Sequence, residues 1–191
     1  MLFNRGQPGS GLSAVTSANV KGGYRATQAL IDAGHSRIAH IAGWNGSLTG
    51  TDRQQGFENA IANAQLLPFA IVDGMYDRDI AADAARRLMS STTRPDAIFV
   101  GNDHMAFAVI DTIRFLGFTI PNDVSIIGYD DVPLAAWAAY DLTTVRQPVN
   151  RMVEAAVTTL LNQIEGDETY LQTIEIEGPL IQRGSSRPAK G

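Results

Sequence analysis

Short apolar runs alternate with helical segments along most of this chain, and this alternation restricts the fold more than any other feature. The apolar runs are rich in β-branched residues, and only a few residues separate them from the helical segments. Such a pattern builds a parallel sheet covered by helices on both faces, with right-handed crossovers. The expected fold class is therefore α/β, with a doubly wound parallel sheet. The strands expected in this region are 37–42, 69–72, 97–100 and 124–127.

The pattern changes outside this region. Asn19 is expected to cap a helix in which Gly22 and Gly23 cost about 1 kcal/mol each against alanine. These two glycines indicate close packing or a close backbone approach. Pro148 is expected to open a long amphipathic helix that Gly166 closes. The remaining expected strands are 1–4, 14–16, 142–145, 170–176 and 180–182.

Polar side chains follow the predicted strands. Asp130 and Asp131 follow one strand, and Asn102 and Asp103 follow another. Charge is costly inside a sheet, so these side chains belong at the rim formed by the carboxyl ends of the strands, where open parallel sheets bind ligands. The alternative is that they are helix caps and turn residues. For Asp103, capping and ligand contact are equal alternatives.

The other expected strand ends complete this set. Together they offer a guanidinium, carboxylates, amides, hydroxyls and an aromatic face, which suit a small polyhydroxylated ligand. The additional side chains are Asn45, Ser47, Thr49, Arg53, Tyr76, Asp77, Arg146 and Gln147.

Composition argues against several other classes of protein. The net charge of −5 leaves no basic footprint for nucleic acid. No apolar run approaches the roughly 20 residues of a membrane span, and no signal peptide is visible, so the cytoplasm is the expected location. The absence of cysteine excludes thiolate chemistry.

Motifs for catalysis and cofactors are also missing. The chain has neither a glycine-rich phosphate cradle nor a nucleophile elbow, and its three histidines are not at metal-ligand spacing. We therefore expect no catalytic residue, no metal and no cofactor. The alternative is an acid hydrolase in which Asp103, Asp130 and Asp131 hold a cation.

An apolar loop spans residues 132–140. It contains Leu134, Trp137 and Tyr140, which are expected either in the core or at a contact between subunits.

Longer motifs are distributed along nearly the whole chain. They are Leu2-Phe-Asn-Arg5, Gly22-Gly23, Leu30-Ile31-x-x-Gly34-His35-x-Arg37-Ile38-Ala39, Ile41-Ala-Gly43, Arg53-x-x-Gly56-Phe57, Asn102-Asp103-x-Met105-Ala106, Ile120-Pro121-x-Asp123-Val124-Ser125, Gly128-Tyr129-Asp130-Asp131 and Leu142-Thr143-Thr144-Val145-x-Gln147-Pro148. Together these motifs resemble the lactose-repressor/galactose-repressor (LacI/GalR) family of transcription regulators, in its effector-binding domain. Periplasmic sugar-binding proteins of the same fold share several of the motifs weakly.

The resemblance implies a periplasmic-binding-protein-like fold of type I, with two similar α/β subdomains, three crossovers and a ligand cleft between them. It implies that Ser47 stands where some members have a larger polar group. The effector contacts that it implies are Arg53, Asp130 and Asn102, with Thr49, Tyr76 and Gln147 nearby and Asn4 from the other subdomain.

The chain departs from the family at its start. The DNA-binding headpiece, the hinge and the first half of the amino-terminal subdomain are expected to be absent, which makes the chain a fragment. Residues 1–17 and 149–176 are the expected remnant of that subdomain, and 18–145 with 177–191 form the complete carboxy-terminal one. The helix from 149 would then expose an apolar face, which favours a swapped or tightly associated dimer.

The function expected from these observations is effector sensing in a repressor-type regulator. A small sugar-like molecule is the expected effector and a homodimer the expected assembly, with operator DNA bound only through a headpiece outside this chain. The alternatives are a sugar-binding protein of a transport system and an enzyme of the same fold class.

Overall fold

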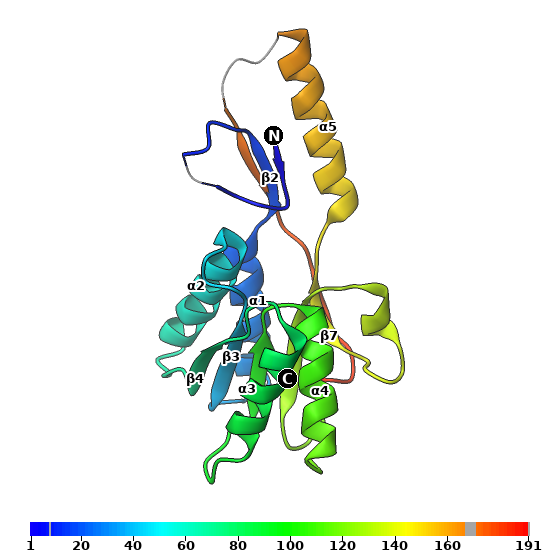
Figure 1. The fold of residues 1–191 in the computed structure, drawn as a ribbon. Coiled ribbons are helices and arrows are strands. Elements are labelled where there is room, and N and C mark those ends of the chain that lie inside the picture. Colours follow the sequence, from blue (N-terminus) through cyan, green and yellow to red (C-terminus); the bar gives the residue numbers. More distant parts are fainter. Residues whose placement is uncertain (8, 167–170, 191) are drawn as a thin grey trace.

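The computed structural model describes residues 1–7, 9–166 and 171–190 (Figure 1). The strands are β1 (Leu2–Phe3), β2 (Ala14–Ser17), β3 (Ile38–Ala42), β4 (Ala70–Asp73), β5 (Ala97–Val100), β6 (Ser125–Asp130), β7 (Thr143–Arg146), β8 (Thr173–Ile176) and β9 (Leu180–Ile181). The helices are α1 (Asn19–Asp32), α2 (Leu48–Asn63), α3 (Arg78–Met89), α4 (Asp103–Phe115), the 3-10 helix η1 (Pro133–Ala136) and α5 (Val149–Glu165).

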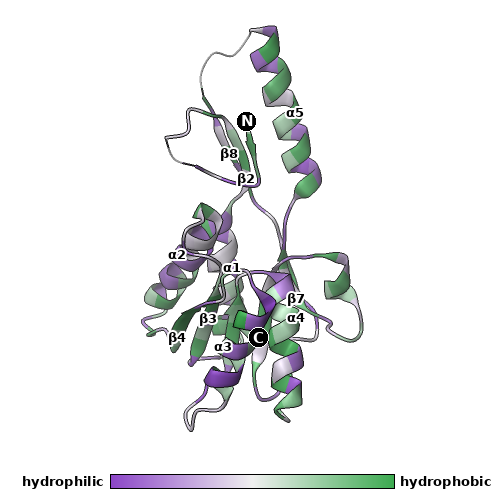
Figure 2. Cartoon of the chain, viewed as in Figure 1, coloured by the Kyte–Doolittle hydropathy of each residue, from purple (hydrophilic) through white to green (hydrophobic). Residues whose placement is uncertain are grey.

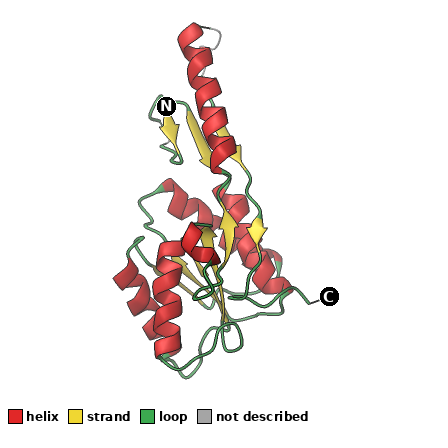
Figure 3. Cartoon of the chain, turned by 90° about the vertical axis from the view of Figure 1, so that its right-hand side faces the viewer, coloured by secondary structure: helices red, strands yellow, loops and turns green. Residues whose placement is uncertain are grey.

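The strands form two separate sheets of unequal size. The larger part of the molecule holds the sheet β4-β3-β5-β6-β7-β9, in which only the β7–β9 pair is antiparallel among the described strands. The smaller part holds the parallel sheet β1-β2-β8 and helix α5. Three connections join the two parts through a narrow waist (Figures 1 and 3). They run from β2 to α1, from β7 to α5 and from β8 to β9.

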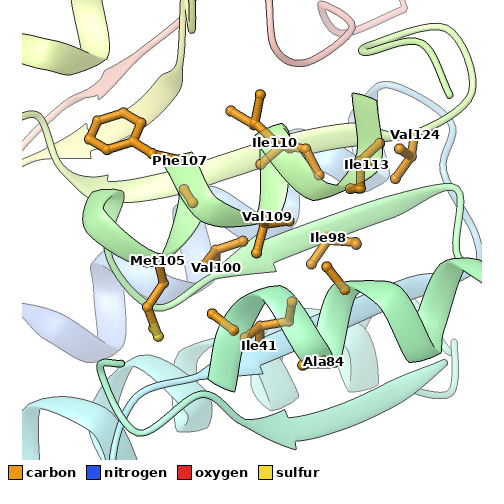
Figure 4. Close-up of a cluster of buried hydrophobic side chains, with 14 of the residues drawn as sticks. Ile41, Ala84, Ile98, Val100, Met105, Phe107, Val109, Ile110, Ile113 and Val124 are labelled. Atoms are coloured by element: carbon orange, nitrogen blue, oxygen red, sulfur yellow. The ribbon is translucent and has the colours of Figure 1, made fainter. Parts of the chain in front are cut away.

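Both faces of the larger sheet are buried. Successive strand residues point to opposite faces, so Ile38 and Phe99 pack with the side chains of α1 and α2. Ile41 and Ile98 instead pack with α3 and α4, as Figure 4 shows. Parallel sheets require such cover on both faces. The expectation of a doubly wound α/β fold is confirmed.

The smaller part has a thinner core. Met152 and Ala156 of α5 pack against Val15 of β2 and Ile176 of β8. Several large apolar side chains elsewhere along α5 stay exposed. Figure 2 shows how much of this helix is hydrophobic, in green. One face of the smaller part is therefore apolar and uncovered.

Strand β6 is longer than the sequence predicts. The expected strand 124–127 is observed as Ser125–Asp130, because the parallel pairing with β7 continues as far as Asp130 opposite Arg146. Gly128 permits this continuation, since a Cβ there would lie 2.4 Å from Asp103 Oδ1 at the start of α4. Asp130 is therefore the last residue of the strand rather than part of the loop after it.

The start of α1 also differs from the expectation. Asn19 is the first helical residue, and Ala18 occupies the N-cap position without a side-chain hydrogen bond, so the predicted cap is wrong. The expectation for the glycines is confirmed. A Cβ on Gly22 would lie 2.3 Å from Tyr129 Oη, and a Cβ on Gly23 would lie 2.2 Å from Arg53 O on α2.

Other boundaries shift by a few residues. The strand expected at 170–176 begins at Thr173, and residue 170 lies outside the described residues. Within the described ranges, no helix combines the length and apolar character that a bilayer crossing needs.

Candidate functional site

The carboxyl ends of β3, β4, β5, β6 and β7 lie along one edge of the larger sheet, which we call the strand-end rim. Helix α2 begins beside this rim and carries Arg53 one turn beyond its start. Arg53 is almost fully buried, and its Nη2 lies 3.4 Å from Asp130 Oδ1 at the end of β6. Two residues 77 positions apart are thus brought together, as the sequence predicts.

The Arg53 guanidinium is restrained on several sides. Its Nε donates to Asn19 Oδ1 at 3.0 Å, and its Nη1 donates to Gly101 O at 2.6 Å. The group also lies 3.6 Å above the centroid of the buried Tyr129 ring. With its face and two of its nitrogens occupied, the guanidinium is fixed with Nη2 toward Asp130.

Asp130 is restrained by the residue after β7. Gln147 Nε2 donates to Asp130 Oδ1 at 2.6 Å, the same oxygen that Arg53 approaches. The backbone of Asp130 has φ 124°, a left-handed value that non-glycine residues rarely adopt. Among the described residues, Asp130 Oδ2 accepts no hydrogen bond, so this oxygen is available to a donor.

The Asp131 carboxylate has different partners from that of Asp130. Its carboxylate is 5% exposed and forms ion pairs with Arg146 at 2.5 Å and Arg183 at 2.7 Å. The Asp103 carboxylate also has partners within the fold, because it accepts hydrogen bonds from Thr144 Oγ1 at 2.6 Å and from the Val132 amide at 2.9 Å. Both carboxylates hold the backbone around Asp130. The described residues contain no cluster of three acidic or histidine side chains able to hold a metal ion.

Several expected contact residues carry buried polar atoms without partners. Tyr76 Oη, Gln147 Oε1 and Asn4 Oδ1 are buried without a hydrogen bond in the described part of the chain. The fourth such atom is His40 Nε2, and the His40 ring stacks between the Phe57 and Phe99 rings. Buried polar groups normally have partners, so an orphaned atom indicates a place for a ligand or water.

Tyr76 lies in a tight loop after β4. Its φ is 57°, and a Cβ on Gly43 would lie 2.1 Å from its ring. Burial raises the pKa of Tyr76, while the Arg53 guanidinium opposes this rise, so the phenol is neutral at pH 7. The Ser47 side chain lies close enough to Tyr76 to lower the pKa of its phenol. The Ser47 hydroxyl itself donates a hydrogen bond to Trp44 O.

Ser47 and Asn102 are helix caps. Ser47 Oγ accepts from the Gly50 amide at 3.1 Å, and Asn102 Oδ1 accepts from the Met105 amide at 2.9 Å. The alternative of capping, raised for Asn102, is thus observed for it, and Ser47 caps α2 as well. Thr49 lies in the first turn of α2. Asn102 directly follows Gly101, whose carbonyl accepts from Arg53, so its amide group stays beside the rim.

Asn4 belongs to the smaller part. It directly follows β1 and has φ 54°. Two residues later, Gly6 approaches the start of α2, where a Cβ on Gly6 would lie 2.3 Å from Leu48 Cδ2. The loop after β1 therefore touches the larger part beside the rim.

The apolar loop after β6 divides between core and surface. Leu134 and Tyr140 pack against the buried cluster beneath α3 and α4. The Tyr140 hydroxyl also donates to Asp111 at 3.2 Å, whereas Trp137 is 63% exposed. Of these three residues, only Trp137 presents a largely free ring.

Two supporting residues were not predicted from the sequence. The sequence predicts Asn19 as a helix cap, and Tyr129 stands out in it only as part of the motif Gly128-Tyr129-Asp130-Asp131. Both are buried and contact Arg53. Gly22 next to Gly23 was the available signal, because a glycine inside a helix marks the space that the Tyr129 ring occupies.

A hollow of about 620 Å³ lies away from the rim, along the outer side of α1. Its basic lining residues Lys21 and Arg25 are paired with Glu177. The hollow contains neither Arg53 nor Asp130, and it offers no orphaned buried group.

Comparison with known proteins identifies the family. A family model described as a periplasmic binding protein-like domain matches residues 27–186. The HTH-type transcriptional repressor PurR of Aliivibrio fischeri (strain MJ11) is 37% identical over 169 residues, which cover 86% of this chain and 50% of that protein. The chain thus spans about half the length of the curated relatives it matches.

Solved structures give the same result. A LacI transcriptional regulator from a Rhodococcus species has a TM-score of 0.90 and 32% identity, and the match covers 98% of this chain and 69% of that one. The transcriptional regulator CelR in complex with cellobiose has a TM-score of 0.88 and 33% identity, with 96% and 57% covered. The resemblance inferred from the motifs is confirmed: this chain belongs to the periplasmic binding protein-like domain family and, within it, to the LacI family of transcriptional regulators.

Proposed function

We propose that this chain is the effector-binding part of a LacI-type transcriptional regulator and that a small polyhydroxylated molecule binds at the strand-end rim. The observation that carries the proposal is the contact between Arg53 and Asp130 at 3.4 Å, with the orphaned Gln147 Oε1 beside it. Arg53 would donate to the ligand, and Asp130 Oδ2 and Gln147 Oε1 would accept from it. Thr49, Ser47, Tyr76 and Asn102 complete the proposed contacts.

The balance of donors and acceptors supports a ligand rich in hydroxyl groups. Gln147 gives its amide N–H to Asp130, so its free atom is an acceptor. Asp130 adds a second acceptor next to it, which requires donors on neighbouring ligand atoms. Adjacent hydroxyls meet this need because each one both donates and accepts. The CelR structure with bound cellobiose supports a carbohydrate-like guest.

Regulation is favoured over transport and catalysis. PurR and the two regulators of similar structure are transcription factors by name. We propose that the chain is not an enzyme, since Asp131 pairs with Arg146 and Arg183, Asp103 accepts from Thr144, and one oxygen of Asp130 lies against Arg53. The proposed location is the cytoplasm, where operator DNA is found.

The proposed division into subdomains follows the two sheets. Residues 18–145 with 177–191 would form the carboxy-terminal subdomain, and 1–17 with 149–176 would belong to the amino-terminal one. Three crossovers suit a hinge. A ligand held between Arg53 of the larger part and Asn4 of the smaller part would favour an arrangement in which the two parts lie close together. In the intact protein, ligand binding would then change the affinity for operator DNA, and operator binding would change the affinity for the ligand by the same factor.

The proposed partners of the intact protein are an effector, a second copy and operator DNA. The exposed Trp137, with Leu134 and Tyr140 beside it, is the proposed contact between copies in the larger part. DNA contact would require a headpiece outside this chain, whose net charge is −5.

The test is a thermal-shift screen of monosaccharides and disaccharides, with cellobiose among them, on the chain and on Arg53→Ala. A sugar at about a hundredfold its Kd should stabilise the chain by about 2.7 kcal/mol. Arg53→Ala should lose this stabilisation. Arg86→Ala is the matched control, because Arg86 is an exposed arginine whose partner is Asp83 on its own helix. Equal stabilisation of Arg53→Ala would refute the proposed site.

A further inference from the structure

The connection from β2 to α1 reaches directly into the proposed effector site. Asn19 is the first residue of α1, is 2% exposed and lies two residues after the end of β2. Its Oδ1 accepts from Arg53 Nε at 3.0 Å. The residue that contacts the arginine is thus part of the first crossover between the two parts of the molecule.

The Asn19 amide has only one usable orientation. Its Nδ2 donates to Ser17 O at 2.9 Å and to Thr16 Oγ1 at 3.3 Å. A carbonyl oxygen can only accept, so the bond to Ser17 fixes which end of the amide carries the nitrogen. The oxygen therefore faces Arg53, and the crossover backbone determines where it lies.

The same crossover supports the face of the guanidinium. Ser17 Oγ lies 3.0 Å from Tyr129 Oη, and the Tyr129 ring lies beneath Arg53. Gly22 leaves the space for this ring. Arg53 is consequently held at one edge through Asn19 and on one face through Ser17 and Tyr129.

We propose that Asn19 is a positioning residue for Arg53: its amide oxygen fixes the guanidinium plane so that Nη2 is presented to Asp130 and to the effector. The inference rests on the proposed function of Arg53. Without Asn19, the guanidinium can turn about its last side-chain bonds, and ordering it on binding weakens the affinity. Because Asn19 lies on the crossover, a shift of β2 relative to α1 also changes the position of Arg53.

The direct test is hydrogen exchange of the Arg53 Nε–H group, followed by NMR on the full 191-residue chain without any sugar. The signal is assigned by its absence in Arg53→Ala. In the wild type this proton should be protected, since it is buried and bonded to Asn19. In Asn19→Ala it should exchange about tenfold faster or more.

Two further variants separate positioning from general stability. Asn19→Asp keeps an oxygen toward Arg53 but loses the donor to Ser17 O, so it should retain the protected Nε–H even where the melting temperature falls. Thr27→Val is the matched control, because Thr27 is a buried residue of α1 whose hydroxyl donates to Gly23 O. This substitution should leave the Arg53 signal unchanged.

The outcomes distinguish this inference from the proposed function. An unprotected Nε–H in the wild type, or equal protection in Asn19→Ala, would overturn the positioning role. So would an equal loss of protection in Thr27→Val. If Asn19→Ala does not fold, Asn19→Leu fills a similar space without offering Arg53 an acceptor, and equal protection in that variant would overturn the role. Sugar binding that survives Arg53→Ala would overturn the proposed function while leaving the Arg53 exchange result intact.

Discussion

Single residues near the rim adopt backbone conformations that cost free energy. Asn4, Tyr76 and Asp130 all have left-handed φ values of 54°, 57° and 124°. Such conformations cost of order 1–3 kcal/mol each at non-glycine residues, so surrounding contacts must maintain them. For Asp130, Gln147 and Arg53 provide these contacts. At Asn4 and Tyr76 this strain coincides with an orphaned polar atom, which is typical of ligand sites and less typical of ordinary loops.

Asp103 gives a prediction about pH. Burial raises its pKa from 3.8 to about 7, against the opposing hydrogen bonds from Thr144 and Val132. The folded state therefore binds a proton that the unfolded state releases, and this contribution to stability is lost as pH rises from about 3.8 to about 7. Asp103→Asn should remove the contribution. The measurement is the free energy of unfolding of both chains at several pH values.

The comparison with Asp103→Asn is needed because His40 acts in the opposite direction. Burial lowers the pKa of His40 to about 4, so its contribution to stability is lost as pH falls. The two residues partly cancel in the wild type. In Asp103→Asn the stability should rise more steeply between pH 4 and 6.5. Identical slopes in the two chains would show that Asp103 titrates normally.

Gly22 gives a prediction about packing. Alanine normally stabilises a helix by about 1 kcal/mol relative to glycine. Here its Cβ would lie 2.3 Å from Tyr129 Oη, and overpacking costs about 1–3 kcal/mol. The collision should win, so Gly22→Ala should lower the free energy of unfolding. Denaturant titrations of a double-mutant cycle with Tyr129→Leu, which removes the ring that the Cβ would meet, should show coupling between the two positions. Strict additivity would contradict the collision.

The sequence predicted which residues would lie together at the rim, but not the residues that support them. Arg53 and Asp130 were predicted to share an edge because parallel strands end together. The partner of Arg53 at Asn19 could not be predicted, since the two residues are 34 positions apart and an asparagine at a helix start usually caps. Nor does the sequence reveal which carboxylates form ion pairs within the fold. Asp131, for example, pairs with Arg146 and Arg183.

At the scale of elements, local periodicity predicted the strands and helices of the larger part. Strand ends were less accurate, because pairing with another strand decides where a strand stops. β6 runs to Asp130 because β7 continues to Arg146 beside it. In the sequence, a glycine that follows an apolar run, such as Gly128, indicates the end of a strand. In the fold, Gly128 lies inside the strand and leaves the space that the Asp103 side chain occupies.

Helix α5 gives a prediction at this scale. The side chains of Val153, Val157, Leu160 and Leu161 on this helix are each close to half exposed. Val153, Val157 and Leu160 border, together with Phe3 of β1, a hollow of about 290 Å³. An apolar face of this kind favours association. The chain should therefore sediment as more than a monomer, and the double variant Val153→Lys with Val157→Lys should shift the particle mass toward that of a monomer.

Leu67→Lys is the matched control for α5. Leu67 is also exposed but lies away from α5, after α2, so removing its side chain should not change the particle mass. An equal shift in both variants would indicate a general effect of added charge. No shift in the α5 variant would mean that its apolar face does not drive association.

At the scale of the whole molecule, the two parts meet beside the rim. The loop after β1 touches α2 where Gly6 approaches Leu48, and the loop that carries Trp44 and Ser47 directly precedes Leu48. A hinge motion at the three crossovers would change the surroundings of this loop. Trp44 is only half exposed, so its environment can report that motion.

Trp44 gives the last prediction. The chain has two tryptophans, and Trp137 is mostly exposed, so Trp137→Phe should leave a folded chain in which only Trp44 emits. A sugar that stabilises the chain should shift this emission to shorter wavelength, because closure of the smaller part removes water from the indole. The same titration on Arg53→Ala in the Trp137→Phe background should show no shift. Heat of binding measured by calorimetry without any change in Trp44 emission would mean that the sugar binds without moving the smaller part toward the rim, and the proposed hinge would then be wrong even though the Arg53 contact remained.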